Sequence, residues 1–179
     1  MKKVKIKKQQ NGFSLIELMV SVGLMSFLLV LAAPSYSAWM ANMRVKSIAE
    51  GINTAILQAK SEAIRRNTPV ILELNADSSW QIKVLNTNSV VNKKGSQEFS
   101  ATTAIEMVPN DSNSITFNGF GFVVPNTDGS STLTNVNINT TSSFDGIKNL
   151  RVNVGAGGSS FVCDPAIADS NNMSYCRGS

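Results

Sequence analysis

The sequence of 179 residues contains no histidine and only two cysteines, Cys163 and Cys176. Histidine is the side chain most often used for proton transfer near neutral pH, and histidine and cysteine supply the ligands of most zinc sites. The chain also lacks a glycine-rich nucleotide motif after a strand and a nucleophile in a recognisable turn. These absences argue against an enzyme, so we expect no catalytic residues, no metal and no cofactor.

Positive charge is concentrated at the start of the chain, although the whole sequence has a net charge of +4 and a pI near 9.2. The first 12 residues hold five of the 16 basic residues and no acidic one: Lys2, Lys3, Lys5, Lys7 and Lys8. The remainder has 11 basic and 12 acidic residues, a net charge of −1. The basic leader fits a cytoplasmic amino terminus, and the rest has no global attraction for DNA.

A long apolar run extends from Gly12 to Pro34 and reads GFSLIELMVSVGLMSFLLVLAAP. As an α-helix it would rise about 33 Å, enough to cross a hydrocarbon core of about 30 Å. One carboxylate, Glu17, lies inside it. An ionised side chain in a membrane costs at least about 2.5 kcal/mol on insertion scales, so Glu17 is expected to meet a cation.

Two simpler explanations of this run are available. A cleavable secretory signal explains the basic start and the small residues of 33–38, but its apolar core would span only about 7 to 15 residues. A plain single-pass anchor explains the length and the lysines, but it leaves Glu17 without a purpose. The length of the run and its acid therefore favour a more specialised segment.

The run Gly12-Phe13-Ser14-Leu15-Ile16-Glu17, after a lysine-rich leader and before an apolar helix, resembles the class III signal of type IV pilins and type II secretion pseudopilins. The resemblance implies that a prepilin peptidase cleaves between Gly12 and Phe13 and that Phe13 becomes N-methylated. It also implies that Glu17 pairs with the amino terminus of a neighbouring subunit during filament assembly.

The chain after the apolar run is expected to continue as a helix to about Asn67. Pro34 removes a backbone donor and should kink the helix, and Pro69 should prevent its continuation. The apolar positions of 36–67 recur at spacings of mostly three and four, which predicts one buried face: Val45, Ile48, Ile52, Ala55, Ile56, Ala59 and Ala63. Arg65 and Arg66 are expected to complement the helix dipole.

Strand patterns dominate the remainder of the chain. We predict a hairpin from residues 70–74 and 80–85, a polar loop over 86–97 with Lys93-Lys94-Gly95 at its tip, and mostly loop over 155–179. Further strands are expected at 99–108, around Ile115 and Phe117, and at 133–138 and 150–154. The predicted fold class is α+β, with a long amino-terminal helix packed on a β-rich pilin head. The expected parts are a leader (1–12), a transmembrane helix (13–35), an amphipathic helix (36–67) and a head (68–179).

The head resembles the H-type pseudopilins and their minor-pilin relatives in several stretches. These are 61–67, the following strand with Val70 and Leu72, Trp80 in the next strand, 115–118 with the glycines after it, and 162–165. The resemblance implies a low-copy structural subunit that is incorporated into a type IV pilus or primes its assembly. A pseudopilin of a type II secretion system is the alternative. The implied partners are the prepilin peptidase, other major and minor pilins or pseudopilins, and the inner membrane. The head would then be periplasmic before assembly and part of a cell-surface filament afterwards.

The two cysteines are expected to form a disulfide in the oxidising periplasm, closing the last loop and stabilising it by roughly 3 kcal/mol. Calcium bound by Asp164, Asp169 and backbone carbonyls is a second possibility for this loop. Asp164 followed by Pro165 is equally typical of a turn.

DNA uptake is a further alternative for the function. Some minor pilins of natural transformation bind DNA through a glycine-arginine-x-arginine motif before the late cysteine. Here the corresponding residues 158–161 read Gly-Ser-Ser-Phe, so both arginines are missing. A different cationic patch remains conceivable from Lys93, Lys94, Arg151 and Arg177, although scattered cations are more typical of a solvated surface.

Overall fold

The computed structural model describes residues 12–95, 103–140 and 146–177, with the side chains of residues 31–34 left aside. The leader lysines and residues 99–102 of an expected strand lie outside this part of the chain. The chain divides into two units, Met1–Ser37 and Ala38–Ser179, and each is considered by itself.

One helix, α1, is assigned from Leu15 to Arg66. It ends as expected before Pro69, because Asn67 takes a left-handed conformation with φ of 47°. The N–H of Asn67 donates to the carbonyl of Ile64 at 3.2 Å, and the N–H of Thr68 donates to that of Ala63 at 3.2 Å. These bonds satisfy carbonyls that the last turn would otherwise leave unpaired. The kink at Pro34 remains a prediction.

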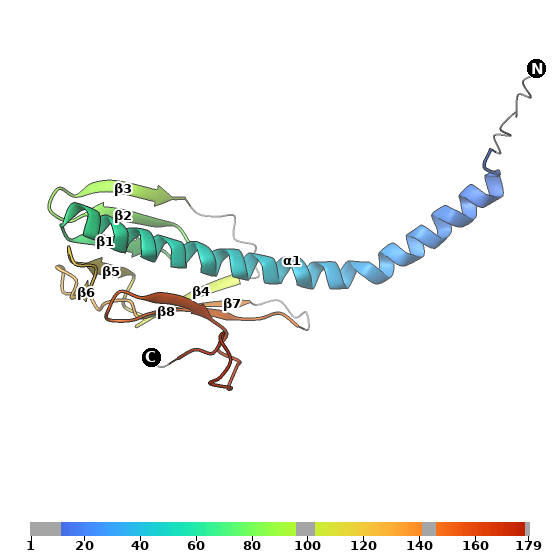
Figure 1. Cartoon of the computed structure of the whole chain (residues 1–179). Coiled ribbons are helices and arrows are strands. Elements are labelled where there is room, and N and C mark those ends of the chain that lie inside the picture. Colours follow the sequence, from blue (N-terminus) through green and yellow to red (C-terminus); the bar gives the residue numbers. More distant parts are fainter. Residues whose placement is uncertain (1–11, 96–102, 141–145, 178–179) are drawn as a thin grey trace, which may run out of the picture. The chain divides into compact units, whose positions relative to one another are not determined.

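The described head contains two antiparallel sheets (Figure 1). The first has the strand order β3-β2-β1-β5-β6 and the second β4-β7-β8-β9. The strands are β1 (Val70–Leu74), β2 (Trp80–Val84), β3 (Ser89–Lys94), β4 (Thr103–Val108), β5 (Ser114–Phe117), β6 (Val123–Val124), β7 (Asn135–Thr140), β8 (Leu150–Val154) and β9 (Ser160–Cys163).

The part of α1 that belongs to the head lies along both sheets, with β1 to β3 on one side and β7 and β8 on the other (Figure 1). Its apolar stripe is buried as predicted, and Ala49 joins it. The stripe packs with both sheets in one core; the fully buried strand residues include Leu72, Ile82, Phe117, Val136 and Ile138. Alanines at 49, 55, 59 and 63 allow the strands to approach the helix closely. The α+β prediction is confirmed.

One loop prediction was wrong, and the prediction of mostly loop over 155–179 holds for the described residues except for one short strand. Residues 89–94 form the edge strand β3, which pairs with β2, so Lys93 and Lys94 lie on a strand rather than at a loop tip. Residues 160–163 form β9, which pairs with β8. Both segments are short and lack apolar alternation, because their apolar residues are adjacent pairs, Val90-Val91 and Phe161-Val162. Their strand form therefore depends on backbone hydrogen bonds to a neighbour. The strand expected at 133–138 is shifted to Asn135–Thr140.

Candidate functional site

Glu17 lies in the first turn of α1. The N–H of Leu18 donates to the carbonyl of Ser14 at 3.1 Å, so the helical hydrogen bonds begin just after the Gly12–Phe13 pair. A carboxylate in this position is favoured by the positive end of the helix dipole. In the part of the chain that the structure describes, the exposed Glu17 carboxylate has no hydrogen bond or ion pair, and its carboxylate is available to a second molecule.

The peptide bond between Gly12 and Phe13 is open on all sides within the described chain. The Phe13 side chain is 84% exposed, and a Cβ added at Gly12 would meet nothing within 4 Å. Packing inside this chain therefore does not require glycine at position 12. A requirement for glycine would have to come from a molecule that acts on the bond.

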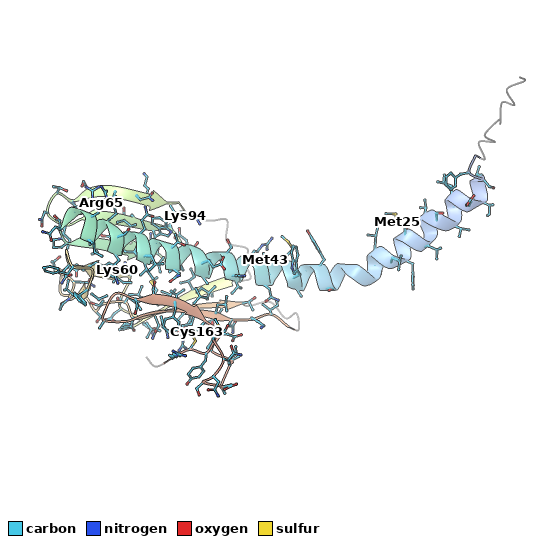
Figure 2. All side chains as sticks on the ribbon, in the orientation of Figure 1. Met25, Met43, Lys60, Arg65, Lys94 and Cys163 are labelled. Carbon is cyan, nitrogen blue, oxygen red and sulfur yellow. A yellow bond between two sulfur atoms is a disulfide. The ribbon has the colours of Figure 1, made fainter. Side chains whose placement is uncertain are left out.

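The first segment of α1, residues 15–30, exposes apolar side chains around the whole helix, including Met25, which is labelled in Figure 2. The exposed residues are Leu15, Ile16, Leu18, Met19, Val20, Val22, Leu24, Met25, Phe27, Leu28, Leu29 and Val30. Such a surface needs an apolar environment or other helices. Its hydroxyls are satisfied internally, since Ser21 donates to the carbonyl of Glu17 at 2.7 Å and Ser26 to that of Val22 at 2.8 Å.

In the described residues, no single helix has the length and hydropathy needed to cross a membrane; the segments Leu15–Val30 and Ser35–Arg66 meet that test only together, as a broken pair.

Three charged side chains at the carboxyl end of α1 pair with one another. Glu62 accepts from Arg65 Nη2 at 2.6 Å and from Arg66 Nε at 2.8 Å. These hydrogen bonds, the one from Arg65 first, hold the pKa of the Glu62 carboxyl below its ordinary value. Both arginines lie in the last turn, where positive charge opposes the negative end of the helix dipole as the sequence suggests.

The expected disulfide between Cys163 and Cys176 is formed. Cys163 ends β9 and is buried, and the N–H of Asp164 donates to the carbonyl of Ser174 at 2.8 Å. The two acids proposed for calcium each serve a turn: Asp164 Oδ1 accepts from the N–H of Ala166, and Asp169 Oδ1 from that of Asn171, both at 2.9 Å.

The four cations considered for DNA come from three separate parts of the head: one strand of each sheet and the terminal segment after Cys176. Lys93 and Lys94 belong to β3, and a Cβ at Gly51 of α1 would lie 3.6 Å from Lys94 Nζ. Arg151 belongs to β8 and donates through Nε to Asn137 Oδ1 at 2.7 Å, so part of its hydrogen-bonding capacity is used inside the sheet. The backbone carbonyl of Arg177 accepts from Asn153 at 3.3 Å. The four residues therefore do not all belong to one element that could bind a phosphate.

A groove that the sequence did not suggest has a volume of about 540 Å³ and lies beside α1, β8 and β9. Met43, Leu150 and Val162 line it, together with Lys148 and Asp164. Next to it, Asn42 donates to the carbonyl of Gly146 at 3.0 Å and accepts from the N–H of Lys148 at 2.9 Å. The sequence did not indicate this bridge, because Asn42 is a single polar residue in a helix and its partners are distant in the chain.

An amino-terminal helix packed on an antiparallel head, with a carboxylate in an exposed apolar first segment, defines a protein of the type IV pilin kind. A profile of the family described as Type II transport protein GspH matches residues 49–158, and one described as Prokaryotic N-terminal methylation motif matches residues 7–33. The chain belongs to the GspH family.

Solved structures resemble the chain at low sequence identity. The type IV minor pilin FimU of Pseudomonas aeruginosa is 17% identical, with a TM-score of 0.53 over 72% of this chain and 97% of that one. The minor pseudopilin EpsH from the Type 2 Secretion System of Vibrio cholerae is 13% identical, with a TM-score of 0.48 over 69% of this chain and 98% of that one. The likeness to FimU supports the fold. No curated protein matches the chain.

Proposed function

We propose that this chain is a low-copy structural subunit, a minor pilin, that is incorporated into a type IV pilus or primes its assembly. The single observation that carries the proposal is Glu17, an unpartnered carboxylate at the start of α1, in a first segment (15–30) that exposes apolar side chains. The methylation motif at residues 7–33 and membership of the GspH family support it. The role is assembly rather than catalysis.

Processing would precede assembly. A prepilin peptidase would cleave the open bond between Gly12 and Phe13 and methylate the new amino terminus at Phe13. The leader would leave the amino terminus on the cytoplasmic side of the inner membrane, with the head in the periplasm and later on a cell-surface filament. Pro34 would kink the helix after the anchor.

The physical role of Glu17 follows from the cost of a charge in an apolar layer. An unpaired carboxylate there costs at least about 2.5 kcal/mol, whereas a cation in contact offsets much of that cost. In the assembled filament the Phe13 amine of a neighbouring subunit would supply this cation. Pairing would set the axial register, and the apolar residues of 15–30 would exchange lipid for other helices.

The test replaces Glu17 with alanine in the full chain. We expect cleavage and head folding to be retained while incorporation into sheared filaments is lost. Mass spectrometry would follow the peptide that begins at Phe13 with one added methyl group, in both the membrane and filament fractions. Glu50→Ala is the matched control, because Glu50 is an exposed glutamate of the same helix outside the apolar segment. Normal incorporation of the Glu17 variant would contradict the proposed role.

The family match favours a second candidate, a pseudopilin of a type II secretion system, because the family is described as Type II transport protein GspH. Deletion of the gene should then leave secreted enzymes in the periplasm while pili and twitching are unaffected. If the processed peptide occurs only in membranes while pili are abundant, this role or an assembly-only role is preferred. DNA uptake has less support, since the stretch before Cys163 has no arginine.

A further inference from the structure

The central strands of the second sheet, β7 and β8, carry mostly asparagine on one face (Figure 1). Alternate residues of a strand point to opposite faces, and Val136, Ile138 and Val152 point into the shared core. The residues of β7 and β8 on the opposite, outer face are Asn135, Asn137, Asn139, Arg151 and Asn153. Asparagine is depleted in strands, so its repeated use opposes the local preference. Such departures are expected at functional sites.

A row of hydrogen-bonded side chains crosses this outer face. The strand register places Glu106 of β4 beside Asn137 of β7, and Asn137 beside Arg151 of β8. Glu106 Oε2 accepts from Asn137 Nδ2 at 3.3 Å and from Asn139 Nδ2 at 3.4 Å. Asn137 Oδ1 in turn accepts from Arg151 Nε at 2.7 Å. The carboxylate, amide and guanidinium groups are therefore held in place by one another, which lowers the entropy lost when a ligand binds.

Much of the hydrogen-bonding capacity of this row is unused. Within the described residues, Glu106 Oε1 and both Nη groups of Arg151 have no hydrogen bond or ion pair. An asparagine amide offers two donor hydrogens and two acceptor lone pairs. In the same part of the chain, the Asn139 side chain donates one hydrogen bond and accepts none. The row therefore presents free donors and free acceptors side by side.

A buried acceptor adds to this face next to the row. Asn153 lies between Asn135 of β7 and Phe161 of β9, and it is only 5% exposed. Its Oδ1 is buried without a hydrogen-bond partner among the described residues, which costs free energy. Its Nδ2 donates to the carbonyl of Arg177 at 3.3 Å, a long bond. Arg177 lies beyond Cys176, so this bond can open while the disulfide stays intact. A ligand donor that enters here would satisfy Asn153 Oδ1.

The charge and polarity of the outer face select the class of ligand. One carboxylate, Glu106, and one guanidinium, Arg151, leave the row without net charge, whereas a phosphate backbone requires several cations. Phe161 is the exposed large apolar residue on this face of the described strands, and it lies at the edge, in β9. Protein interfaces usually have their aromatic anchors near the centre. A neutral ligand with many hydroxyl groups fits best, because each hydroxyl both donates and accepts.

We propose that the outer face of the second sheet binds a neutral polysaccharide through Asn137, Asn139 and Arg151. Sugar hydroxyls accept from the Nη groups of Arg151 and donate to Glu106 Oε1. The row spans two interstrand distances, about 10 Å, which suits linked sugars rather than a single one. Phe161 offers an apolar ring to the C–H groups of a sugar. This binding site lies in the head and does not depend on the assembly role of Glu17.

Glycan binding by the full-length chain tests the proposal. An array of neutral, sialylated and sulfated glycans is probed with the chain in a detergent whose head group is not a sugar, so that the detergent does not compete. We expect binding to neutral glycans, and titration calorimetry then measures the dissociation constant for the strongest of them. Asn137→Thr should raise this constant about tenfold or more, because it removes one amide and releases Arg151. Asn171→Thr is the matched control, because Asn171 is an exposed asparagine in the terminal loop, and it should bind normally.

The stability of the head separates binding from a structural role. Threonine is favoured in strands, so Asn137→Thr and Asn139→Thr should retain or raise the unfolding midpoint while both weaken glycan binding. A purely structural role predicts that the midpoint falls and that binding is lost only with the fold. Any one of four results would overturn the proposal: no glycan bound at millimolar concentration, binding only to sialylated or sulfated glycans, equal affinities of Asn137→Thr and Asn171→Thr, or weaker binding only in variants with an unfolded head.

Discussion

The two halves of α1 are built from the same kind of residue but have opposite surroundings. The apolar side chains of 15–30 are exposed, whereas the apolar stripe of 45–63 is buried against both sheets. In the first half apolar residues occupy nearly every position, and in the second they alternate with charged residues such as Lys46 and Glu50. The presence of apolar residues alone therefore does not show which half is buried, whereas their periodicity does, since a one-sided stripe indicates a partner within the chain.

The largest expected effect is the loss of head stability when a large apolar side chain is shortened in the buried half of α1 but not in the exposed half. Ile56→Ala should lower the free energy of unfolding of the head by about 2–5 kcal/mol, because Ile56 is fully buried. Leu28→Ala removes a similar group from an exposed position and should leave head stability unchanged. Thermal and denaturant unfolding of the full chain in detergent would measure both. Equal losses in the two variants would show that the halves are not energetically distinct.

Alanine substitutions at two glycines, one in the head and one in the apolar half of α1, should differ in their effect on head stability by a smaller amount. Gly158 has φ of +70°, and its Cβ would collide with the carbonyl oxygen of Gly121, so Gly158→Ala should cost about 1–3 kcal/mol of head stability. Gly23 lies in the apolar half with nothing within 4 Å of an added Cβ. Gly23→Ala should raise helix propensity without affecting the head. Unfolding midpoints and helical circular dichroism would show both effects, and a neutral Gly158→Ala would contradict the packing at this corner.

The smallest expected effect concerns Glu62, which lies near the carboxyl end of α1. Glu62 has a lowered pKa because it accepts from Arg65 and Arg66. Its contribution is present above its ordinary pKa of 4.5 and is lost as pH falls through the lower folded value, because the unfolded chain takes up the proton first. Since the arginines are exposed, the effect should be about 0.5 kcal/mol.

Unfolding of the head between pH 6 and pH 3 would measure this contribution. Glu62→Gln should flatten part of the pH dependence, while Glu50→Gln, which removes an exposed partner of Lys46 at 3.7 Å, should change it less. A steeper dependence in Glu62→Gln than in the unmodified chain would contradict the assigned cause.

Much of the fold followed from the sequence because its signals are local. The stripe from Val45 to Ala63, the end of α1 before Pro69, and the β1–β2 hairpin each arise from periodicity or from proline chemistry within a few residues. The candidate site at Gly12, Phe13 and Glu17 followed from an ordered motif, and its processing and pairing remain predictions. The disulfide could be expected because the chain has only two cysteines.

The features that escaped prediction depend on distant residues. Strand β9 has only four residues and becomes a strand by pairing with β8, and the Asn42 bridge joins residues 104 positions apart. Gly121 and Gly158 both have positive φ, a conformation that glycine adopts readily. Their contact with each other, and the exposure of Phe120 beside it, could not be read from either segment alone.

The position of β3 at the edge of its sheet affects whether neighbouring heads can aggregate when they are crowded together. It forms an edge of its sheet, and edge strands with unpaired backbone groups are sites where proteins aggregate into continuous β-structure. The register of β2 and β3 shifts between Ile82 and Lys83, and β3 ends in Lys93 and Lys94. A bulge and two adjacent charges make this edge a poor template for a foreign strand. Crowded heads can therefore remain separate folded bodies instead of fusing into amyloid-like sheets.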